Sequence, residues 1–286
     1  MIKIIASDMD GTLLNSKHEI HEENIKAIKI AQRLGVQTVI STGREYETVA
    51  PLLKEAGLRC QCVLMNGAEY RDEDGNILER INIEKSKATQ ITDMVQAVGM
   101  RSEIFTSHGI YTTNTKEEAL KGIAHMVQHF EKFPSFKDAL EVAKVHPHFK
   151  ILKYIENIEE FLCSEIEIRK ILAFYSDEDI ISNMKKKVNG LGGLAVSSSF
   201  KDNIEITDKL AQKGLTLAKV ADKMGISRNE VIVIGDSFND YSMFEEFKES
   251  FAMGNAIPEI KEIAKYVTDT NDEAGVAKAI YKALNL

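Results

Sequence analysis

Three short polar segments of the chain carry residue types that can bind ions and move protons. Each directly follows an apolar or β-branched run, and they are 8–12 (DMDGT), 41–44 (STGR) and 235–240 (GDSFND). In open parallel α/β sheets, ligands bind at the carboxyl ends of the strands. We therefore expect residues that are far apart in the sequence to converge on one crevice.

Acidic residues dominate two of these segments. In one crevice their carboxylates would repel each other strongly, which either raises their pKa values or recruits a cation. A hard divalent ion with oxygen ligands resolves the repulsion, and Mg²⁺ suits the setting because it keeps several waters and takes only one or two carboxylates. The acids concerned are Asp8, Asp10, Asp236 and Asp240.

The segment at 41–44 has a different character. Its hydroxyl groups and the backbone N–H groups at Thr42 and Gly43, near a predicted helix start, describe an anion site to which a lysine would add charge. A metal that faces an anion pocket, with a carboxylate between them, is what phosphoryl transfer to an aspartate requires. The sequence therefore favours phosphoryl chemistry at these strand ends.

Residues 1–66 alternate between the periodicities of buried strands and amphipathic helices. Apolar or β-branched runs predict strands buried on both faces, and apolar residues at helical spacing predict the helices between them. This alternation predicts a parallel sheet with right-handed crossovers. Pro51 lies inside the second helix, where we expect a kink or a restart. The predicted strands and helices are, in chain order, 2–7, 22–34, 36–42, 44–56 and 62–65.

The same pattern returns near the C-terminus. It predicts a helix over 208–225, a buried strand over 231–235, a short helix from Pro258 and a final helix through Ala279. These elements supply a second α/β half that completes the sheet.

Residues 83–207 show a different sequence pattern, which predicts a mixture of helices and antiparallel strands. The predicted helices are 84–98, 116–130 and 177–188, and a predicted strand lies within 165–176. A segment between two halves of one sheet is best interpreted as an inserted domain, and a length of 286 residues agrees with two domains of about 150 residues each. We predict an α/β fold with a parallel-sheet core (1–82 and 208–286) and an inserted α+β domain (83–207).

The three polar segments resemble motifs I, II and IV of the haloacid dehalogenase (HAD) superfamily. The residues that carry the resemblance are DMDGTLL at 8–14, STGR at 41–44 and GDSFND at 235–240. Their order and spacing resemble those of the Cof-type phosphatases, in which a large α/β cap is inserted after motif II. Lys213, within AQKG, resembles motif III, so the resemblance covers essentially the whole chain.

The resemblance implies a Rossmann-like core and Mg²⁺-dependent hydrolysis of phosphate monoesters of small metabolites, with sugar phosphates as the first expectation. Asp8 would be the nucleophile that forms an aspartyl-phosphate. Asp10 would be the general acid to the leaving alkoxide and then the base for the attacking water. The metal would be held by the Asp8 carboxylate, the Asp10 main-chain carbonyl and the Asp236 carboxylate. Asp240 would act through water or by orienting Lys213.

The same resemblance implies a set of groups that hold the phosphoryl oxygens. A carboxylate that attacks a dianion faces charge repulsion, and each donor that relieves such repulsion is commonly worth ~3–4 kcal/mol. The groups are the Met9 amide, Thr42, the Gly43 amide, Lys213 and Asn239.

Two other functions stay open at this stage. A phosphotransferase such as a phosphomutase uses the same nucleophile but returns the phosphoryl group to a sugar, and the sequence does not show whether water or a substrate hydroxyl reaches the intermediate. A non-catalytic HAD-fold binding module would keep the fold without turnover. The presence of a suitable residue at every catalytic position argues against that second alternative.

Two further features have both a structural and a functional interpretation. Asn66-Gly67 follows the third predicted strand and forms either only a tight turn or a turn that contacts the site. Asn203 and Glu205 lie in the polar pattern of residues 197–207, where they either contact the leaving group or reflect the polarity of a surface strand.

Other polar residues receive a structural interpretation. Residues 72–76 (DEDGN) resemble part of a calcium loop, but a tyrosine occupies the position of its first acid, so we predict a hairpin turn. His125 and His129 have a metal-like spacing without the Glu of a zincin motif, which favours an exposed helix face. His146 and His148 flank a proline in a predicted loop and have no assigned role.

Composition excludes several classes of protein. The chain has 36 Lys and Arg against 44 Asp and Glu, a formal charge of −8 that argues against nonspecific nucleic-acid binding. No apolar run approaches the ~20 residues that span a bilayer, and the start MIKIIASDMDG is too short and too soon acidic for a secretory signal. Three cysteines are too few for a disulfide framework, which favours a reducing, cytoplasmic setting. We expect a small phosphorylated metabolite as partner, neither nucleic acid nor membrane, and a monomer or homodimer.

Overall fold

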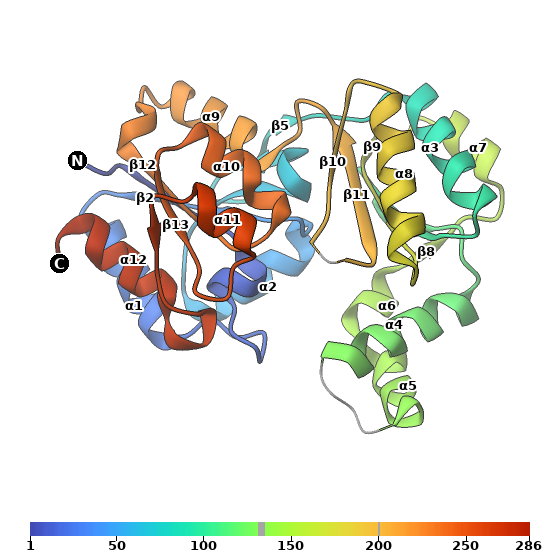
Figure 1. Cartoon of the computed structure of the whole chain (residues 1–286), viewed down its shortest axis with the longest axis horizontal. Coiled ribbons are helices and arrows are strands. Elements are labelled where there is room, and N and C mark those ends of the chain that lie inside the picture. Colours follow the sequence, from blue (N-terminus) through green and yellow to red (C-terminus); the bar gives the residue numbers. More distant parts are fainter. Residues whose placement is uncertain (131–134, 200) are drawn as a thin grey trace. The chain divides into compact units, whose positions relative to one another are not determined.

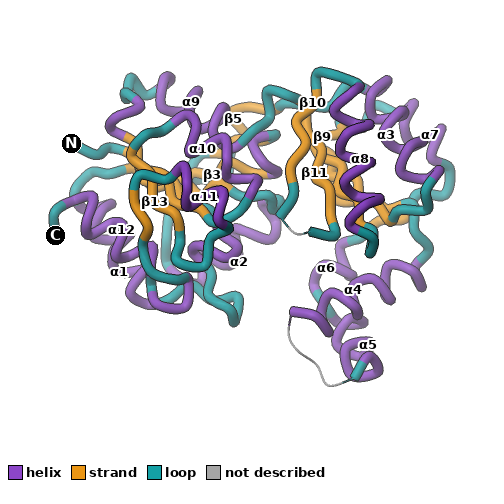
Figure 2. Tube along the Cα trace, in the orientation of Figure 1, coloured by secondary structure: helices purple, strands orange, loops and turns teal. Residues whose placement is uncertain are grey.

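A computed structural model describes residues 1–130, 135–199 and 201–286, which divide into two units (Figures 1 and 2). Unit 1 comprises Met1–Asn82, Gly193–Ser199 and Thr207–Leu286, and unit 2 comprises Ile83–Gly192 and Phe200–Ile206. Within the described ranges, no helix is both long enough and apolar enough to cross a bilayer. The mixed α/β fold with a parallel-sheet core confirms the predicted fold class.

Eight strands form the sheet of unit 1, in the order β14-β13-β12-β1-β2-β3-β4-β5. The strands from β14 to β3 run parallel to their neighbours, and β4 and β5 add an antiparallel hairpin. Every residue of β1 and β12 is buried, as expected for central strands of a parallel sheet. The strands are β1 (Ile4–Ser7), β2 (Gln37–Ser41), β3 (Gln61–Leu64), β4 (Glu69–Arg71), β5 (Ile77–Arg80), β12 (Val231–Gly235), β13 (Glu249–Ala252) and β14 (Tyr266–Val267).

Helices α1, α2, α10 and α11 connect parallel strands of this sheet, whereas α9 precedes β12 and α12 follows β14. Helices α1 and α12 lie side by side, and α9 and α10 also pack against each other (Figure 1). The helices of unit 1 are α1 (Glu22–Arg33), α2 (Tyr46–Ala56), α9 (Lys213–Lys223), α10 (Tyr241–Glu246), α11 (Pro258–Ile263) and α12 (Gly275–Leu284). The alternation predicted for 1–66 and for the C-terminal region is therefore confirmed.

The α2 helix runs as one helix from Tyr46 to Ala56, so the restart predicted as one possibility at Pro51 is wrong. A proline inside a helix removes one hydrogen bond, here the bond to the carbonyl of Glu47. Pro51 and Glu47 are both exposed, so water can satisfy the carbonyl that loses its donor. The helix ends at Gly57, which adopts the left-handed conformation that glycine allows.

The helix predicted over 208–225 begins five residues later than expected, at Lys213. Asp208 ends strand β11, and its side chain accepts a hydrogen bond from the backbone N–H of Leu210 at 2.9 Å. This local bond favours a turn over a helix. As a result, Lys213 is the first residue of α9 rather than a residue of its second turn.

The predicted hairpin turn at 72–76 is confirmed. It joins β4 and β5, and the N–H of Asp72 donates to the carbonyl of Asn76 at 3.0 Å. The side chain of Asp72 accepts a further bond from the N–H of Asn76 at 2.8 Å, so its carboxylate is used within the turn.

Six strands form the second sheet, in the order β10-β11-β9-β6-β7-β8. The central pair β6–β9 and the pair β6–β7 are antiparallel, as predicted for this region. The strands are β6 (Arg101–Thr106), β7 (Gly109–Thr112), β8 (Lys153–Tyr154), β9 (Ile168–Phe174), β10 (Leu194–Ser197) and β11 (Asn203–Asp208). The helices are α3 (Lys85–Ala97), α4 (Lys116–Phe130), α5 (Phe136–Val145), α6 (Pro147–Ile151), α7 (Ile158–Cys163) and α8 (Glu178–Gly190).

Two of the histidines of this region, His125 and His148, lie on helices. His125 is exposed on α4, as predicted, and its ring packs against that of Phe136 with centroids 4.5 Å apart; the side chain of His129 lies outside the described residues. The loop predicted around His146 and His148 is wrong for His148, which lies in α6, whereas His146 lies between α5 and α6. Proline is favoured at the first position of a helix, and here it begins α6 with His146 as the capping residue.

Asn203 and Glu205 are only 2% and 3% exposed, so their interpretation as surface polarity is wrong. Glu205 forms an ion pair with Lys170 of β9, whose side chain is equally buried, at 2.7 Å. The Nζ of Lys170 also lies 5.0 Å from the centre of the Phe105 ring. Strand β11 therefore carries a buried charge that the neighbouring strand compensates.

Candidate active site at the switch point of the parallel sheet

The chain reverses its direction of travel across the sheet at β1. From β1 it proceeds through β2 to β3, whereas from β12, on the other side of β1, it proceeds through β13 to β14. Loops therefore separate at the carboxyl ends of β1 and β12, the position at which open α/β sheets bind ligands. Asp8 follows β1 and Asp236 follows β12, and the N–H of Asp8 donates to the carbonyl of Ile234 at 2.9 Å.

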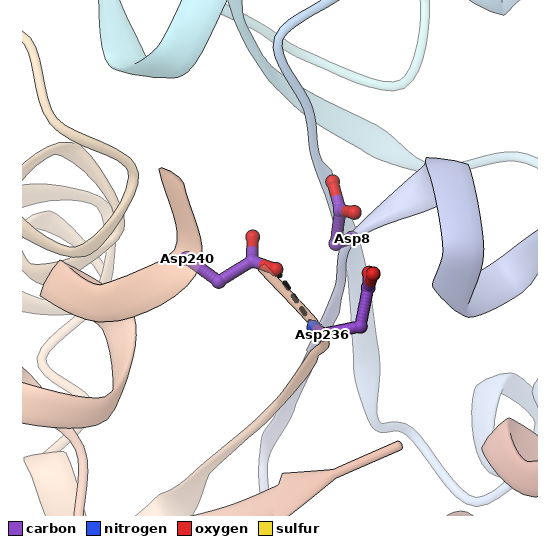
Figure 3. Close-up of side chains that lie close together, drawn as sticks. All are labelled: Asp8, Asp236 and Asp240. Carbon is purple, nitrogen blue, oxygen red and sulfur yellow. Dashed lines mark hydrogen bonds between the residues drawn. The ribbon is translucent and has the colours of Figure 1, made fainter. Parts of the chain in front are cut away.

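Three carboxylates meet at this point, as Figure 3 shows. One oxygen from each of Asp8, Asp236 and Asp240 lies within 4.8 Å of the others. Lys213, whose side chain is fully buried, donates to Oδ1 of Asp8 and to Oδ1 of Asp240, each at 2.6 Å. The first residue of α9 thus reaches the acids that follow β1 and β12.

Burial shifts the pKa values of the acids and of Lys213 in opposite directions, because it disfavours the charged form of each group. Burial, and then the charge of Asp240, raise the pKa of Asp8 well above its ordinary value, although Lys213 opposes the rise. Burial and Asp240 likewise raise the pKa of Asp236 to about 7, against the hydrogen bond from Thr12. Burial alone lowers the pKa of Lys213, but Asp240 and Asp8 outweigh it and raise that pKa, so the lysine stays charged.

Asp240 is occupied on both of its oxygens. Oδ1 accepts from Lys213, and Oδ2 accepts from the backbone N–H groups of Asp236 at 2.8 Å and Ser237 at 3.1 Å (Figure 3). This arrangement suits a residue that orients Lys213 and shapes the loop after β12. It leaves Asp8 and Asp236 as the carboxylates better placed to accept a cation.

The donor set of the cluster fits a hard divalent cation. Three carboxylates face a single lysine, so the group keeps an excess of negative charge in a buried position, which is costly without compensation. Oxygen ligands of this kind are those that Mg²⁺ takes in proteins. The residues present could therefore hold such an ion.

The loop after β1 is shaped by its glycine. Gly11 has a φ of +73°, and a Cβ placed on it would lie 2.6 Å from Oδ2 of Asp236, so only glycine fits. The neighbouring Thr12 donates from Oγ1 to Oδ1 of Asp236 at 2.8 Å. Asn255, which follows β13, donates from Nδ2 to the Gly11 carbonyl at 2.8 Å. The sequence does not identify Asn255, because nothing in its spacing from the motifs links it to this loop.

The predicted anion-binding residues lie in the loops after β1, β2 and β12. Met9 and Thr42 are buried, Gly43 is half-buried beside Thr42, and Asn239 is half-buried two residues beyond Ser237. The hydroxyl of Thr42 accepts from the N–H of Arg44 at 3.2 Å, which leaves its own hydrogen available to a ligand. Together with Lys213, they remain the residues predicted to hold an anion.

The Asn66-Gly67 turn does contact a candidate site residue. Asn66 accepts at Oδ1 from Nδ2 of Asn239 at 3.3 Å. Gly67 has a φ of +103°, and a Cβ there would lie 2.6 Å from the carbonyl of Gln212, directly before Lys213. The turn thus packs on the segment that presents the lysine.

Arg44, which the sequence singles out only as part of STGR, contacts Asp10 directly. Its Nε and Nη2 donate to the two carboxylate oxygens of Asp10 at 2.7 and 2.5 Å. Burial lowers the pKa of Arg44, but its hydrogen bonds to Asp10 and the charge of that carboxylate outweigh burial and raise it. The motif spacing placed both residues at strand ends, but it could not show that one side chain reaches the other.

Known proteins resemble the chain along nearly its whole length. The family model of the haloacid dehalogenase-like hydrolases matches residues 5–280. The phosphatase YwpJ of Bacillus subtilis (strain 168) is 33% identical over 278 residues, which cover 96% of this chain and 98% of that protein. The 5-amino-6-(5-phospho-D-ribitylamino)uracil phosphatase YwtE of the same organism is 33% identical over 284 residues, 99% of each chain. The solved structure of a haloacid dehalogenase-like hydrolase from B. subtilis, 33% identical, is similar with a TM-score of 0.87 over 98% of this chain and 99% of that one.

Proposed function

Because the chain belongs to the haloacid dehalogenase-like hydrolase family and is a phosphatase, we propose that it hydrolyses phosphate monoesters through an aspartyl-phosphate on Asp8. One observation carries the proposal. Buried Lys213 bridges Asp8 and Asp240, with Asp236 beside them, at the switch point of the sheet. A carboxylate held next to a fixed positive charge can approach a phosphate dianion that would otherwise repel it.

The proposed reaction has two steps. A carboxylate oxygen of Asp8 forms a bond to phosphorus while the bond from phosphorus to the ester oxygen breaks, and Asp10 gives its proton to the departing oxygen. A water molecule then attacks the phosphorus of the aspartyl-phosphate and gives a proton to Asp10. Inorganic phosphate leaves, and the carboxylate of Asp8 is restored. Asp10 is thus the acid of the first step and the base of the second.

The groups around the acids hold the phosphoryl oxygens and offset their charge. Lys213 carries a full positive charge in a buried position, where electrostatic interactions are stronger than in water. Backbone and side-chain donors complete the set: the Met9 amide, Thr42, the Gly43 amide and Asn239.

Mg²⁺ is the metal that the proposal assigns to this site. It would be held by the carboxylates of Asp8 and Asp236 and by the main-chain carbonyl of Asp10. When bound, it would neutralise part of the charge that the phosphoryl group and the carboxylates bring together.

We assign the substrate to the small phosphorylated metabolites, with sugar phosphates as the first class to test. The relative YwtE, a 5-amino-6-(5-phospho-D-ribitylamino)uracil phosphatase by name, supports a small-metabolite substrate. In this proposal, residues 83–207 form a cap that selects the substrate, and residues 1–82 and 208–286 form the catalytic core. We assign the protein to the cytoplasm, because three cysteines are too few for a disulfide framework.

Hydrolysis of p-nitrophenyl phosphate, with added Mg²⁺ and with an EDTA control, tests the proposal. Asp8→Asn is expected to abolish turnover, and Asp10→Asn to lower it by roughly 10²–10⁴-fold. Comparable turnover in wild type and the Asp8 variant would overturn the assignment. A panel of phosphorylated metabolites then narrows the substrate, and release of inorganic phosphate rather than an isomerised sugar phosphate separates a phosphatase from a phosphomutase.

A further inference from the structure

Asp10 and Arg44 form a two-pronged ion pair between the loops that follow β1 and β2. The Nε of Arg44 donates to Oδ2 of Asp10 at 2.7 Å, and its Nη2 donates to Oδ1 at 2.5 Å. Both oxygens of the carboxylate therefore face one guanidinium. This fork geometry fixes the orientation of a carboxylate as well as its position, which a lysine cannot do.

The backbone of Arg44 is itself held at both of its polar groups. Its N–H donates to Oγ1 of Thr42 at 3.2 Å, and its carbonyl accepts from the N–H of Met65 at 2.9 Å. The guanidinium therefore extends toward Asp10 from a fixed point of the loop after β2.

The position of this pair points to a role besides stability. The side chain of Asp10 is 45% exposed and that of Arg44 28% exposed, so water screens part of the attraction between them. The loops that carry the two residues are already fixed by backbone hydrogen bonds, such as that from the N–H of Asn66 to the carbonyl of Thr42. What the pair supplies is a defined orientation of one carboxylate.

We propose that Arg44 is the positioning residue for Asp10 and holds its carboxyl group in the orientation that proton transfer requires. The inference rests on the proposed function, in which Asp10 gives a proton to the leaving oxygen and later takes one from water. In the fork, both oxygens of Asp10 accept from Arg44, which is the arrangement of a carboxylate that is ready to take a proton from water. Arg44 makes no bond to the substrate in this scheme and acts only through Asp10.

The substitution Arg44→Gln tests the proposal, because it keeps a planar amide but removes the charge and the fork. Misplacing a catalytic group by about 1 Å can cost 10²-fold, so we expect kcat to fall by roughly 10–100-fold while KM stays within about three-fold. The loss should be larger for an alkyl phosphate than for p-nitrophenyl phosphate, because nitrophenolate departs with little help from an acid.

A double-mutant cycle separates action through Asp10 from direct contact with the substrate. If Arg44 acts only through Asp10, Arg44→Gln adds little to the loss that Asp10→Asn already causes. Losses that multiply, or an effect that falls mainly on KM, would overturn the proposal, because they would place Arg44 on the substrate.

Chemical rescue distinguishes a positioning role from damage to the fold. Millimolar guanidinium chloride should restore part of the kcat of Arg44→Ala, whereas a misfolded variant would gain nothing. Arg59→Gln is the matched control, because it removes an exposed arginine that pairs with Asp74 at 2.6 Å, and its kcat should equal that of wild type. Absence of rescue in a variant with wild-type circular dichroism and melting temperature would overturn the inference.

Different results would contradict the positioning role of Arg44 and the proposed phosphatase function. A wild-type protein that hydrolyses no phosphate ester contradicts the proposed function. An active wild type whose kcat is unchanged by Arg44→Gln contradicts only the positioning role.

Discussion

Replacing Asp236 by asparagine should stabilise the metal-free protein while it removes the metal response. Burial and the charge of Asp240 raise the pKa of Asp236 from an ordinary 3.8 to about 7. The native state therefore keeps a proton that the unfolded chain loses between about pH 4 and pH 7. Because the native state binds more protons in that window, the free energy of unfolding falls as the pH rises through it.

The size of the effect follows from the same shift. A pKa raised from 3.8 to about 7 corresponds to a penalty of up to about 4 kcal/mol once the carboxylate is ionised, above pH 7. Asparagine carries no charge, and its carbonyl oxygen can still accept the bond that Thr12 donates to Oδ1 at 2.8 Å. Asp236→Asn should therefore raise the free energy of unfolding at pH 8 by up to about 4 kcal/mol and change it little at pH 4.

Urea unfolding in EDTA at the two pH values measures this difference, and a second series with saturating Mg²⁺ measures the metal response. Wild type should gain stability with Mg²⁺, because the ion binds the folded state, whereas the variant should gain little. Asp222→Asn is the control of opposite sign: its carboxylate is exposed, and its hydrogen bonds to Arg228 lower its pKa. An Asp236 variant that is less stable than wild type at pH 8 in EDTA, or that responds fully to Mg²⁺, would refute the reasoning.

Three further substitutions test other parts of the account. Asp240→Asn removes the charge that holds Lys213 and should lower kcat by at least ~10²-fold while the fold is retained. Steady-state kinetics measure kcat, and circular dichroism checks the fold. An unaltered kcat would exclude the orienting role of Asp240. Glu205→Gln removes the carboxylate that pairs with buried Lys170 and should lower the free energy of unfolding in urea by ~3–5 kcal/mol. A change below ~1 kcal/mol would mean that the pair is dispensable. Asn255→Ala removes the hydrogen bond to the Gly11 carbonyl in the loop after β1, and should lower kcat while the free energy of unfolding changes little. A large loss of stability with an unchanged kcat would make the role of Asn255 structural.

The elements of the core could be predicted because their burial leaves a clear pattern in the sequence. β1 and β12 are buried throughout, so they appear as unbroken apolar runs, and the acids that end them mark the carboxyl end of the sheet. Once both strands belong to one parallel sheet, their ends must adjoin. For this reason the sequence predicts that Asp8 and Asp236 lie close together, although they are 228 positions apart in the chain.

The remaining features depend on geometry that the pattern does not contain. A proline predicts an interrupted helix only if the lost hydrogen bond matters, and at exposed Pro51 it does not. A polar residue in a strand looks the same whether it faces water or a charged neighbour, so the pairing of Glu205 with Lys170 was invisible. The reach of Arg44 to Asp10 likewise depends on side-chain conformation rather than on spacing.

The central claim, that Asp8 accepts the phosphoryl group, can be tested by trapping the intermediate. Borohydride reduces an acyl phosphate to an alcohol but leaves a free carboxylate intact, so a quench during turnover converts a phosphorylated aspartate to homoserine. Asp10→Asn slows the second step, because the base for water is lost, and should let the intermediate accumulate. Peptide mass spectrometry of that variant, quenched during reaction with p-nitrophenyl phosphate, should find homoserine at position 8, and none when substrate is omitted. An unmodified Asp8 in the quenched protein, or a reduced residue at any other position, would contradict the account.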